Sequence, residues 1–296
     1  MSAIAVFIWT AYSVSAVNWE QGVFNWTKGA TQVEAHEYPW KVSIQANYRP
    51  KQQAFDWGHE FMGAILNHRW VVTGGVNIVH KCVKYSRCRI IAGTTNVSVN
   101  TRHGTVINVE KVYPHYTSRP NSTGGDIALI RTLENIPIES PTIGIICLLP
   151  PTSQDDTALV GKSCFTITWG KWKTRLRDDI LFKIDLKVVP HMDCTRNIPG
   201  LPRTNLCGSR TDAGKDKPAY TCTLGTGAPL VCNINGVYSL IGLSSFGGID
   251  CMLREQPFVF VRTQDFYTWM NEAIEIHNYQ EQEIELEPED RKKRRY

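Results

Sequence analysis

Short stretches of apolar residues, separated by turn-forming residues, recur along most of the chain. Such stretches, rich in Val and Ile, are typical of β-strands. A first group of strands is predicted at residues 41–45, 64–73, 89–92, 105–112 and 127–132. After a proline-rich break at 137–151, a second group is predicted at 163–169, 181–189, 228–232, 237–243 and 257–263.

The period of the apolar positions changes near the C-terminal end. Phe266, Trp269, Met270, Ala273 and Ile274 fall on one face of a helix. Two groups of strands followed by one helix predict two small β-barrels and a closing helix. No internal sequence repeat is evident.

Composition narrows the class of protein. With 296 residues, 42% of them hydrophobic, the chain can bury a large core, which excludes a disordered chain or a small disulfide knot. A net charge of +4 without a clustered basic stripe does not favour nucleic-acid binding. No acidic or His/Cys cluster has ligand spacing, so no metal or other cofactor is expected.

The N-terminus and the cysteines indicate a secreted or vesicular protein. Residues 1–16 are predicted to be a signal peptide, because a short apolar run ends in small residues; residues 17–26 form a segment after it. No Lys or Arg precedes the run, and the alternative is a core strand or helix. Asn25, Asn96 and Asn121 begin glycosylation motifs.

Nine cysteines are many for a cytosolic protein, and their odd number leaves at least one thiol over if disulfides form. No later segment is apolar enough for a transmembrane span.

The last residues differ in composition from the rest. Residues 277–296 contain alternating glutamates and then the basic run Arg291–Arg295, with little to bury, so they are predicted to be a disordered acidic and basic tail. A partner-binding tail or a basic processing site is the functional alternative to a solvated extension.

Seven segments, in order and spacing, resemble one family. They are YPWKVSIQ at 38–45, WVVT at 70–73, GDIALI at 125–130, ICLLP at 146–150, WG at 169–170, GTGAPLVC at 225–232 and FYTWM at 266–270. Together they resemble a chymotrypsin/trypsin-type serine protease domain over residues 27–276. The resemblance implies an all-β fold of two six-stranded antiparallel barrels with a C-terminal helix.

The catalytic triad of that family is broken in this sequence. In the family a serine attacks, a histidine takes its proton, and a buried aspartate orients the histidine. The aspartate matches Asp126, but the histidine position is Val76 and the serine position is Thr226. A hydroxyl without a general base is a poor nucleophile at neutral pH.

Two neighbouring histidines are candidates for a displaced base. His59 and His80 are expected to be ordinary loop or rim residues, because either would have to reach both Thr226 and Asp126. Without a histidine, a buried Asp126 must be satisfied by backbone N–H groups or hydroxyls. The resemblance implies Ser245 as the hydroxyl donor, because it matches the serine beside this aspartate in the family.

Other parts of the site also depart from the family pattern. The resemblance places Leu224 where a glycine contributes to the oxyanion hole. It places Tyr220 at the floor and Phe258 on the wall of the specificity pocket, which two aromatic rings should fill. Gly225 stands where an aspartate pairs with the new N-terminal amine of an activated protease, and residues 27–30 lack the activation sequence.

Disulfide pairing is implied by the same resemblance. Cys164–Cys232, Cys194–Cys207 and Cys222–Cys251 match family bridges. A fourth bridge is missing, because its positions hold Phe61 and Asn77. Cys82 and Cys88 could form a local extra bridge or remain two free thiols. Cys147 is left over and is expected to be a buried thiol; the alternative is a site of intermolecular contact.

These features lead to one functional prediction with two alternatives. The chain is predicted to be a secreted, glycosylated, inactive serine protease homologue that acts by binding protein partners. One alternative is a weak residual hydrolase that uses Thr226. Another is an electrostatic adaptor that works through Arg291–Arg295.

Overall fold

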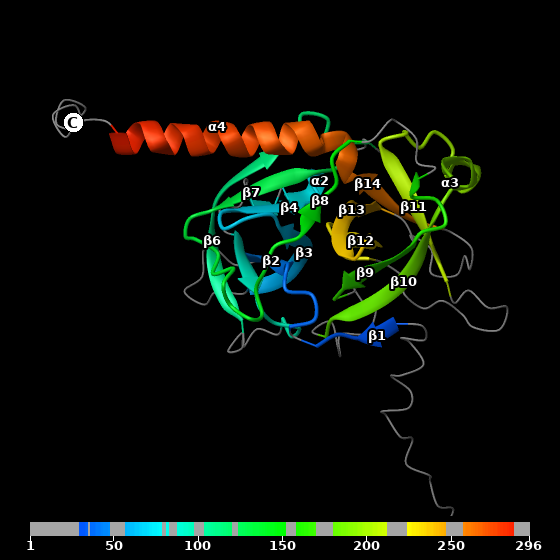
Figure 1. Cartoon of the computed structure of the whole chain (residues 1–296), viewed down its shortest axis with the longest axis horizontal. Coiled ribbons are helices and arrows are strands. Elements are labelled where there is room, and N and C mark those ends of the chain that lie inside the picture. The colour runs from blue at the N-terminus through cyan, green and yellow to red at the C-terminus, as the bar shows by residue number, and fades with distance from the viewer. Residues whose placement is uncertain are drawn as a thin grey trace, which may run out of the picture.

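The fold consists of two β-barrels side by side, with one long helix alongside the first (Figure 1). The computed structural model describes residues 30–34, 36–47, 57–78, 81–82, 88–97, 104–119, 124–151, 158–169, 180–211, 224–246 and 257–286. Within these ranges no helix is long and apolar enough to cross a membrane. The predicted signal peptide and residues 17–26 lie outside them.

The first barrel is a closed antiparallel sheet. Its strands pair in the order β2–β3–β4–β7–β6–β5, and β5 pairs back to β2. Apolar side chains that include Val42, Ile44, Ile65, Val71 and Ile90 fill its interior. The strands are β2 (Lys41–Asn47), β3 (Trp57–Ile65), β4 (Trp70–Thr73), β5 (Cys88–Ala92), β6 (Thr105–Pro114) and β7 (Ala128–Thr132).

The second barrel repeats the strand order of the first, although the two halves share no evident sequence repeat. Its strands pair in the order β9–β10–β11–β14–β13–β12, and β12 pairs back to β9 to close the ring. The strands are β9 (Ser163–Thr168), β10 (Phe182–Val189), β11 (Asn205–Arg210), β12 (Pro229–Ile234), β13 (Val237–Phe246) and β14 (Phe258–Arg262). The prediction of two six-stranded antiparallel barrels with a C-terminal helix is confirmed.

Two short strands are added to the second barrel. β1 (Ala30–Gln32) pairs antiparallel with the first half of β10, and β8 (Cys147–Leu148) pairs parallel with the start of β13. Because β11 pairs only with the second half of β10, β1 covers the edge that β11 leaves open.

Both faces of β2 are buried, which places this strand between the barrels. Val42 and Ile44 point into the first barrel, as the alternation of a strand requires. On the opposite face Lys41, Ser43 and Gln45 are buried as well. Apolar residues of both barrels, among them Met62, Trp70, Phe165 and Val231, form one cluster across the junction.

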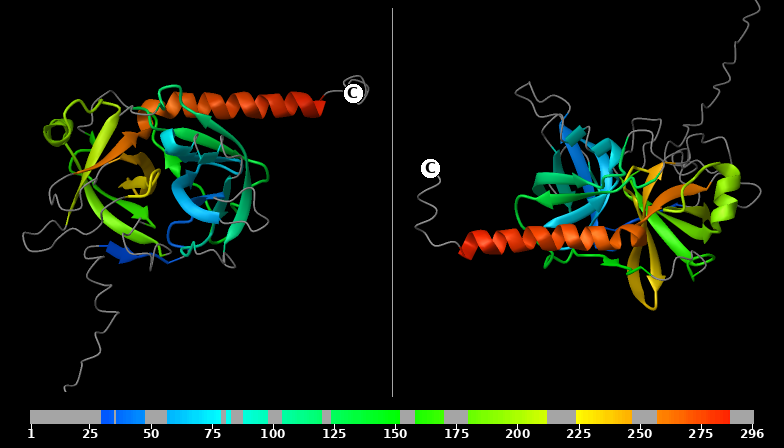
Figure 2. Two further views of the ribbon diagram at one scale, coloured as in Figure 1. Left: turned by 180° about the vertical axis from the view of Figure 1, so that it is seen from behind. Right: turned by 90° about the horizontal axis from the view of Figure 1, so that it is seen from above.

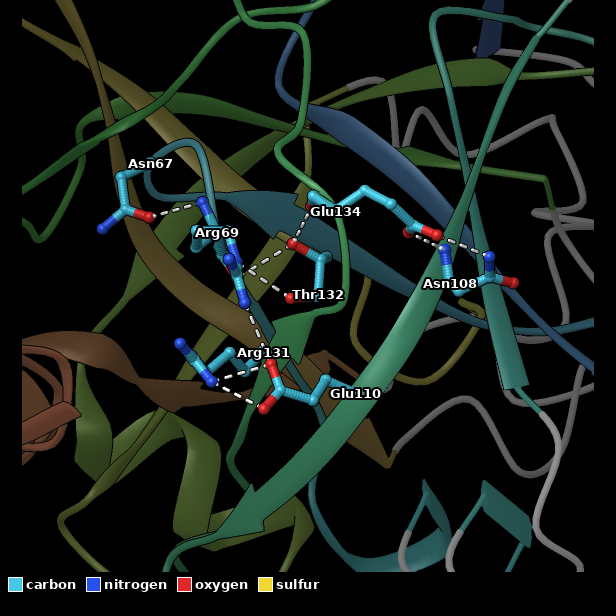
Figure 3. Close-up of polar contacts among 7 residues, drawn as sticks. All are labelled: Asn67, Arg69, Asn108, Glu110, Arg131, Thr132 and Glu134. Carbon is cyan, nitrogen blue, oxygen red and sulfur yellow. Dashed lines mark hydrogen bonds and ion pairs between the residues drawn. The ribbon is translucent and has the colours of Figure 1, made fainter. Parts of the chain in front are cut away.

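A polar network fastens three strands on the outside of the first barrel (Figure 3). Arg69, just before β4, donates from Nε to the carbonyl oxygen of Thr132 in β7 at 2.9 Å and from Nη2 to Glu110 in β6 at 3.0 Å. Arg131 Nη1 contacts both oxygens of Glu110, at 2.6 and 2.7 Å. Glu134 accepts from the backbone and side-chain nitrogens of Asn108, so the turn after β7 is tied to β6.

The strands predicted from the sequence differ from the observed strands at two places. The predicted strand at 64–73 is the end of β3, a turn, and β4; in the turn, Asn67 Oδ1 accepts from Arg69 N at 2.9 Å. β11 was missed because its six residues include only Leu206 and Cys207 as apolar signals. The short helix α3 (His191–Asn197) was missed as well.

The C-terminal helix is longer than predicted. α4 (Tyr267–Leu286) continues ten residues into the segment predicted to be a disordered tail, so the start of the tail at 277 was wrong (Figure 2). Its last turns are rich in Glu and Gln, which favour helix, and it ends two residues before Pro288. The ring of His277 packs against Tyr113 and Trp70, with centroids at 4.6 and 5.6 Å, and so holds the helix on the first barrel. Residues 287–296 lie outside the described ranges.

Lys41 is an unusual residue to find between the barrels. Its side chain is 1% exposed, and Nζ donates to the carbonyl oxygen of Tyr38 at 3.2 Å. Burial lowers its pKa from 10.5 to about 8, and the charge of Glu37 opposes this shift only in part. A folded-state pKa below the unfolded value means that the folded chain releases a proton first, so stability should rise as the pH increases from about 8 to 10.5.

We predict that Lys41→Met stabilises the protein at pH 7 by about 2–3 kcal/mol, because the substitution removes a buried charge. The variant should also lose most of the rise in stability above pH 8. Urea unfolding from pH 6 to 10 checks both, with the exposed Lys187→Met as control. Equal pH profiles for Lys41→Met and the unmodified chain would contradict this prediction.

Candidate functional site

The carboxylate of Asp126 is the centre of the candidate site. The side chain is buried, with 3% exposure, just before β7. Oδ1 accepts hydrogen bonds from the backbone nitrogens of Gly75 at 2.7 Å and Val76 at 2.6 Å. Oδ2 accepts from Ser245 Oγ at 2.6 Å, as expected from the sequence. The first barrel and the second barrel therefore each supply donors to this one group.

Val76 begins the short helix α2 (Val76–Ile78) and is half-buried. Its side chain has no atom that can accept or donate a proton. The backbone before it is closely packed: a Cβ at Gly75 would lie 2.6 Å from the carbonyl oxygen of Ile127 and would overlap Ser118 Oγ. The absence of a side chain at Gly75 thus lets the loop reach Asp126.

Thr226 lies in a tight loop at the start of β12. A Cβ built on Gly74 would lie 2.7 Å from Thr226 Cγ2, so this methyl group faces the loop that leads to Val76. Its hydroxyl makes no hydrogen bond within the described part of the chain. The structure thus brings the three positions together but places no base beside Thr226 among the residues it describes.

Two described histidines lie near this region and have other partners. His59 Nδ1 is 2.7 Å from Ser43 Oγ, and its ring stacks edge-on against Trp169 between the barrels. His115 Nδ1 is 2.7 Å from Thr117 Oγ1, and its ring packs against Phe266 and Trp269. Burial lowers the pKa of His115, which favours a neutral ring. His80 lies outside the described ranges.

The structure describes three of the four remaining site positions. Leu224 is half-buried and packs against both the inter-barrel cluster and the interior of the second barrel. Phe258 is 7% exposed and belongs to that interior. Gly225 is buried and carries no carboxylate. Tyr220 lies outside the described ranges, so filling of the pocket by two aromatic rings stays a prediction.

Met62 is a site residue that the sequence analysis missed. It is 0% exposed, and its side chain lies next to Gly225. Residues 62 and 225 are far apart in sequence, and no local pattern could indicate that they meet.

Three of the predicted disulfides are confirmed. They join Cys82–Cys88, Cys164–Cys232 and Cys194–Cys207. Cys222 and Cys251 lie outside the described ranges. Cys147 is free and exposed, so the expectation of a buried thiol was wrong. Its neighbour Ile146 points into the core, and the alternation along β8 turns Cys147 outward.

An ion pair lies close to the site of the missing bridge. Glu60, beside Phe61, pairs with Lys81, four residues after Asn77. The Lys81 ammonium also lies 6.0 Å from the Phe61 ring centroid. Phe61 itself packs in the cluster that contains Ile78 and Cys82. These contacts connect the two segments that the bridge would have joined.

The asparagine of one glycosylation motif lies within the described ranges. Asn96 is exposed, whereas Asn25 and Asn121 lie outside the described ranges. No group of three or more His, Cys, Asp or Glu residues with a geometry suited to a metal ion occurs in the described part of the chain.

Comparison with known proteins places this arrangement in a family. The chain is 28% identical over 256 residues to "Chymotrypsin-like elastase family member 1" of Homo sapiens, covering 83% of this chain and 91% of that protein. It is 29% identical over 260 residues to "CLIP domain-containing serine protease B4" of Anopheles gambiae, covering 83% of this chain and 69% of that protein. The model of the family described as Trypsin matches residues 27–270. The chain therefore belongs to the trypsin family of serine proteases.

Proposed function

We propose that this protein is a non-catalytic member of its family, a secreted pseudoprotease that acts by binding other proteins. The observation that carries the proposal is the environment of Asp126. Both carboxylate oxygens accept hydrogen bonds from Gly75, Val76 and Ser245, and no imidazole stands at position 76. The aspartate is thus satisfied as a structural group.

The chemistry of Thr226 supports the same conclusion. Its hydroxyl would need a base to become a nucleophile, and it has no hydrogen-bond partner in the described ranges. Loss of one triad member already costs several orders of magnitude in rate. Leu224 and Gly225 remove further parts of the machinery that the family uses for oxyanion binding and activation.

Three features support secretion. Three disulfides within the described chain are typical of proteins that fold in an oxidising compartment. Residues 1–16 have the pattern of a signal peptide, and Asn96 is exposed at a glycosylation motif. We place the protein outside the cell or in a vesicle of the secretory pathway.

Surface loops on this rigid framework are the proposed contact regions for protein partners. Cys147 provides a group for covalent linkage, because an exposed thiol in an oxidising compartment can form a mixed disulfide with a partner's thiol. The two thiols together lose two protons and two electrons, and a small-molecule disulfide takes up both and is reduced to two thiols.

We predict that a fluorophosphonate probe does not label the purified protein, because no base activates Thr226. In-gel fluorescence and intact mass measure labelling, with an active trypsin treated in parallel. Labelling that disappears in Thr226→Ala would contradict the proposal and support a weak residual hydrolase. The double variant Val76→His/Thr226→Ser should stay inactive, since Leu224 and Gly225 remain.

We predict that Asp126→Ala lowers the free energy of unfolding by at least about 3 kcal/mol, because it leaves three buried donors unpaired. Ser245→Ala should cost about 1–2 kcal/mol. Urea unfolding measures both, and the exposed Asp185→Ala, expected to cost under about 1 kcal/mol, is the control. A cost for Asp126→Ala no larger than that of the control would show that the carboxylate is not structural.

We predict that protein secreted from cultured cells carries a mixed disulfide at Cys147. Non-reducing electrophoresis should show an additional species of higher mass, absent after reduction and absent from Cys147→Ser. A fully free thiol, detected by quantitative alkylation of the native protein at Cys147, would contradict covalent linkage to a partner.

A further inference from the structure

A buried methionine lies directly against the loop that carries Thr226. Met62 in β3 is 0% exposed. A Cβ built on Gly225 would lie 3.5 Å from Met62 Cγ and 3.7 Å from Met62 Sδ, which is ordinary van der Waals contact. The thioether side chain therefore fills the space next to Gly225.

The backbone of Met62 holds the same loop. Its N–H donates to the carbonyl oxygen of Thr226 at 2.8 Å. Its carbonyl oxygen, which accepts from Thr73 Oγ1 at 2.5 Å, lies so close to Gly227 that a Cβ there would overlap it. Gly227 has φ +80°, so both its conformation and its surroundings require glycine.

The second barrel fixes the other side of this loop. Gly225 N donates to Thr168 Oγ1 at 3.2 Å, and Ser244 Oγ donates to the Gly225 carbonyl oxygen at 2.5 Å. Gly227 N donates to the Ser244 carbonyl oxygen at 2.8 Å. Leu224 packs on the cluster that contains Met62. The loop is thus held between Met62 and β13.

We propose that Met62 is the positioning residue that keeps residues 224–228 in this conformation, and that its packing replaces the ion pair which the family resemblance places at position 225. Gly225 offers no carboxylate, so a new N-terminal amine would find no partner there. The loop conformation is therefore independent of cleavage before residue 27. This inference rests on the proposed function, because it describes how an uncleaved, non-catalytic chain keeps its site ordered.

Hydrogen exchange of the loop amides tests the role of Met62. In the full-length chain, Met62→Ala should accelerate exchange at Gly227 and Ala228 by at least about tenfold relative to Met270→Ala. Met270 is the matched control, because it is equally buried in the same cluster but lies on α4. Met62→Leu, which keeps apolar volume, should retain protection within about threefold of the unmodified chain.

The cleavage arm uses a chain whose residues 24–26 are replaced by the recognition site of a specific protease. Cutting before Thr27 should leave loop exchange unchanged. Slower exchange after cleavage, or equal exchange in Met62→Ala and Met270→Ala, would overturn the inference. Probe labelling of Thr226 would overturn the proposed function instead, so the two failures are distinguishable.

Discussion

A single carboxylate between two barrels constrains much of the structure around the site. Asp126 is almost entirely buried, and a carboxyl group in that position needs hydrogen-bond partners for both oxygens. One oxygen accepts from Gly75 and Val76 at the start of α2, and the other accepts from Ser245 near the end of β13. The loop, the aspartate and the strand must therefore stay in register, which couples the two barrels at this point.

Several polar groups of β2 and of the barrel junction are also satisfied by hydrogen bonds. β2 turns its apolar face into the first barrel and a polar face toward the junction, where Ser43 meets His59 and Gln45 Oε1 accepts from Arg89. Trp169 of the second barrel donates to the carbonyl oxygen of Thr95 at 2.9 Å. The Trp169–Thr95 hydrogen bond joins the two barrels and orients them more specifically than an apolar surface alone, because a donor requires an acceptor in a fixed direction.

Much of the fold could be predicted from the sequence because strand alternation is a local signal. Val42 and Ile44, for example, indicate a strand by their two-residue spacing and their β-branched side chains. β11 has only two apolar residues to indicate it. The turn at Asn67 interrupts the apolar pattern too briefly to separate β3 from β4. The triad positions and the Ser245 contact both came from the family resemblance; the need to satisfy Asp126 gave the reason for that contact. The contact of Met62 with Gly225 depends on long-range packing, which neither source contains.

The substitutions around the site make physical sense as a set. A carboxylate at 225 without an amine partner would leave a buried charge, whereas glycine leaves space that Met62 fills with apolar atoms. An aspartate at 126 without an imidazole keeps three donors, because glycine at 75 lets the backbone approach. Each position is compatible with its neighbours through packing and hydrogen bonding alone. Under the proposed function, a site organised in this way gains its order from burial and hydrogen bonding.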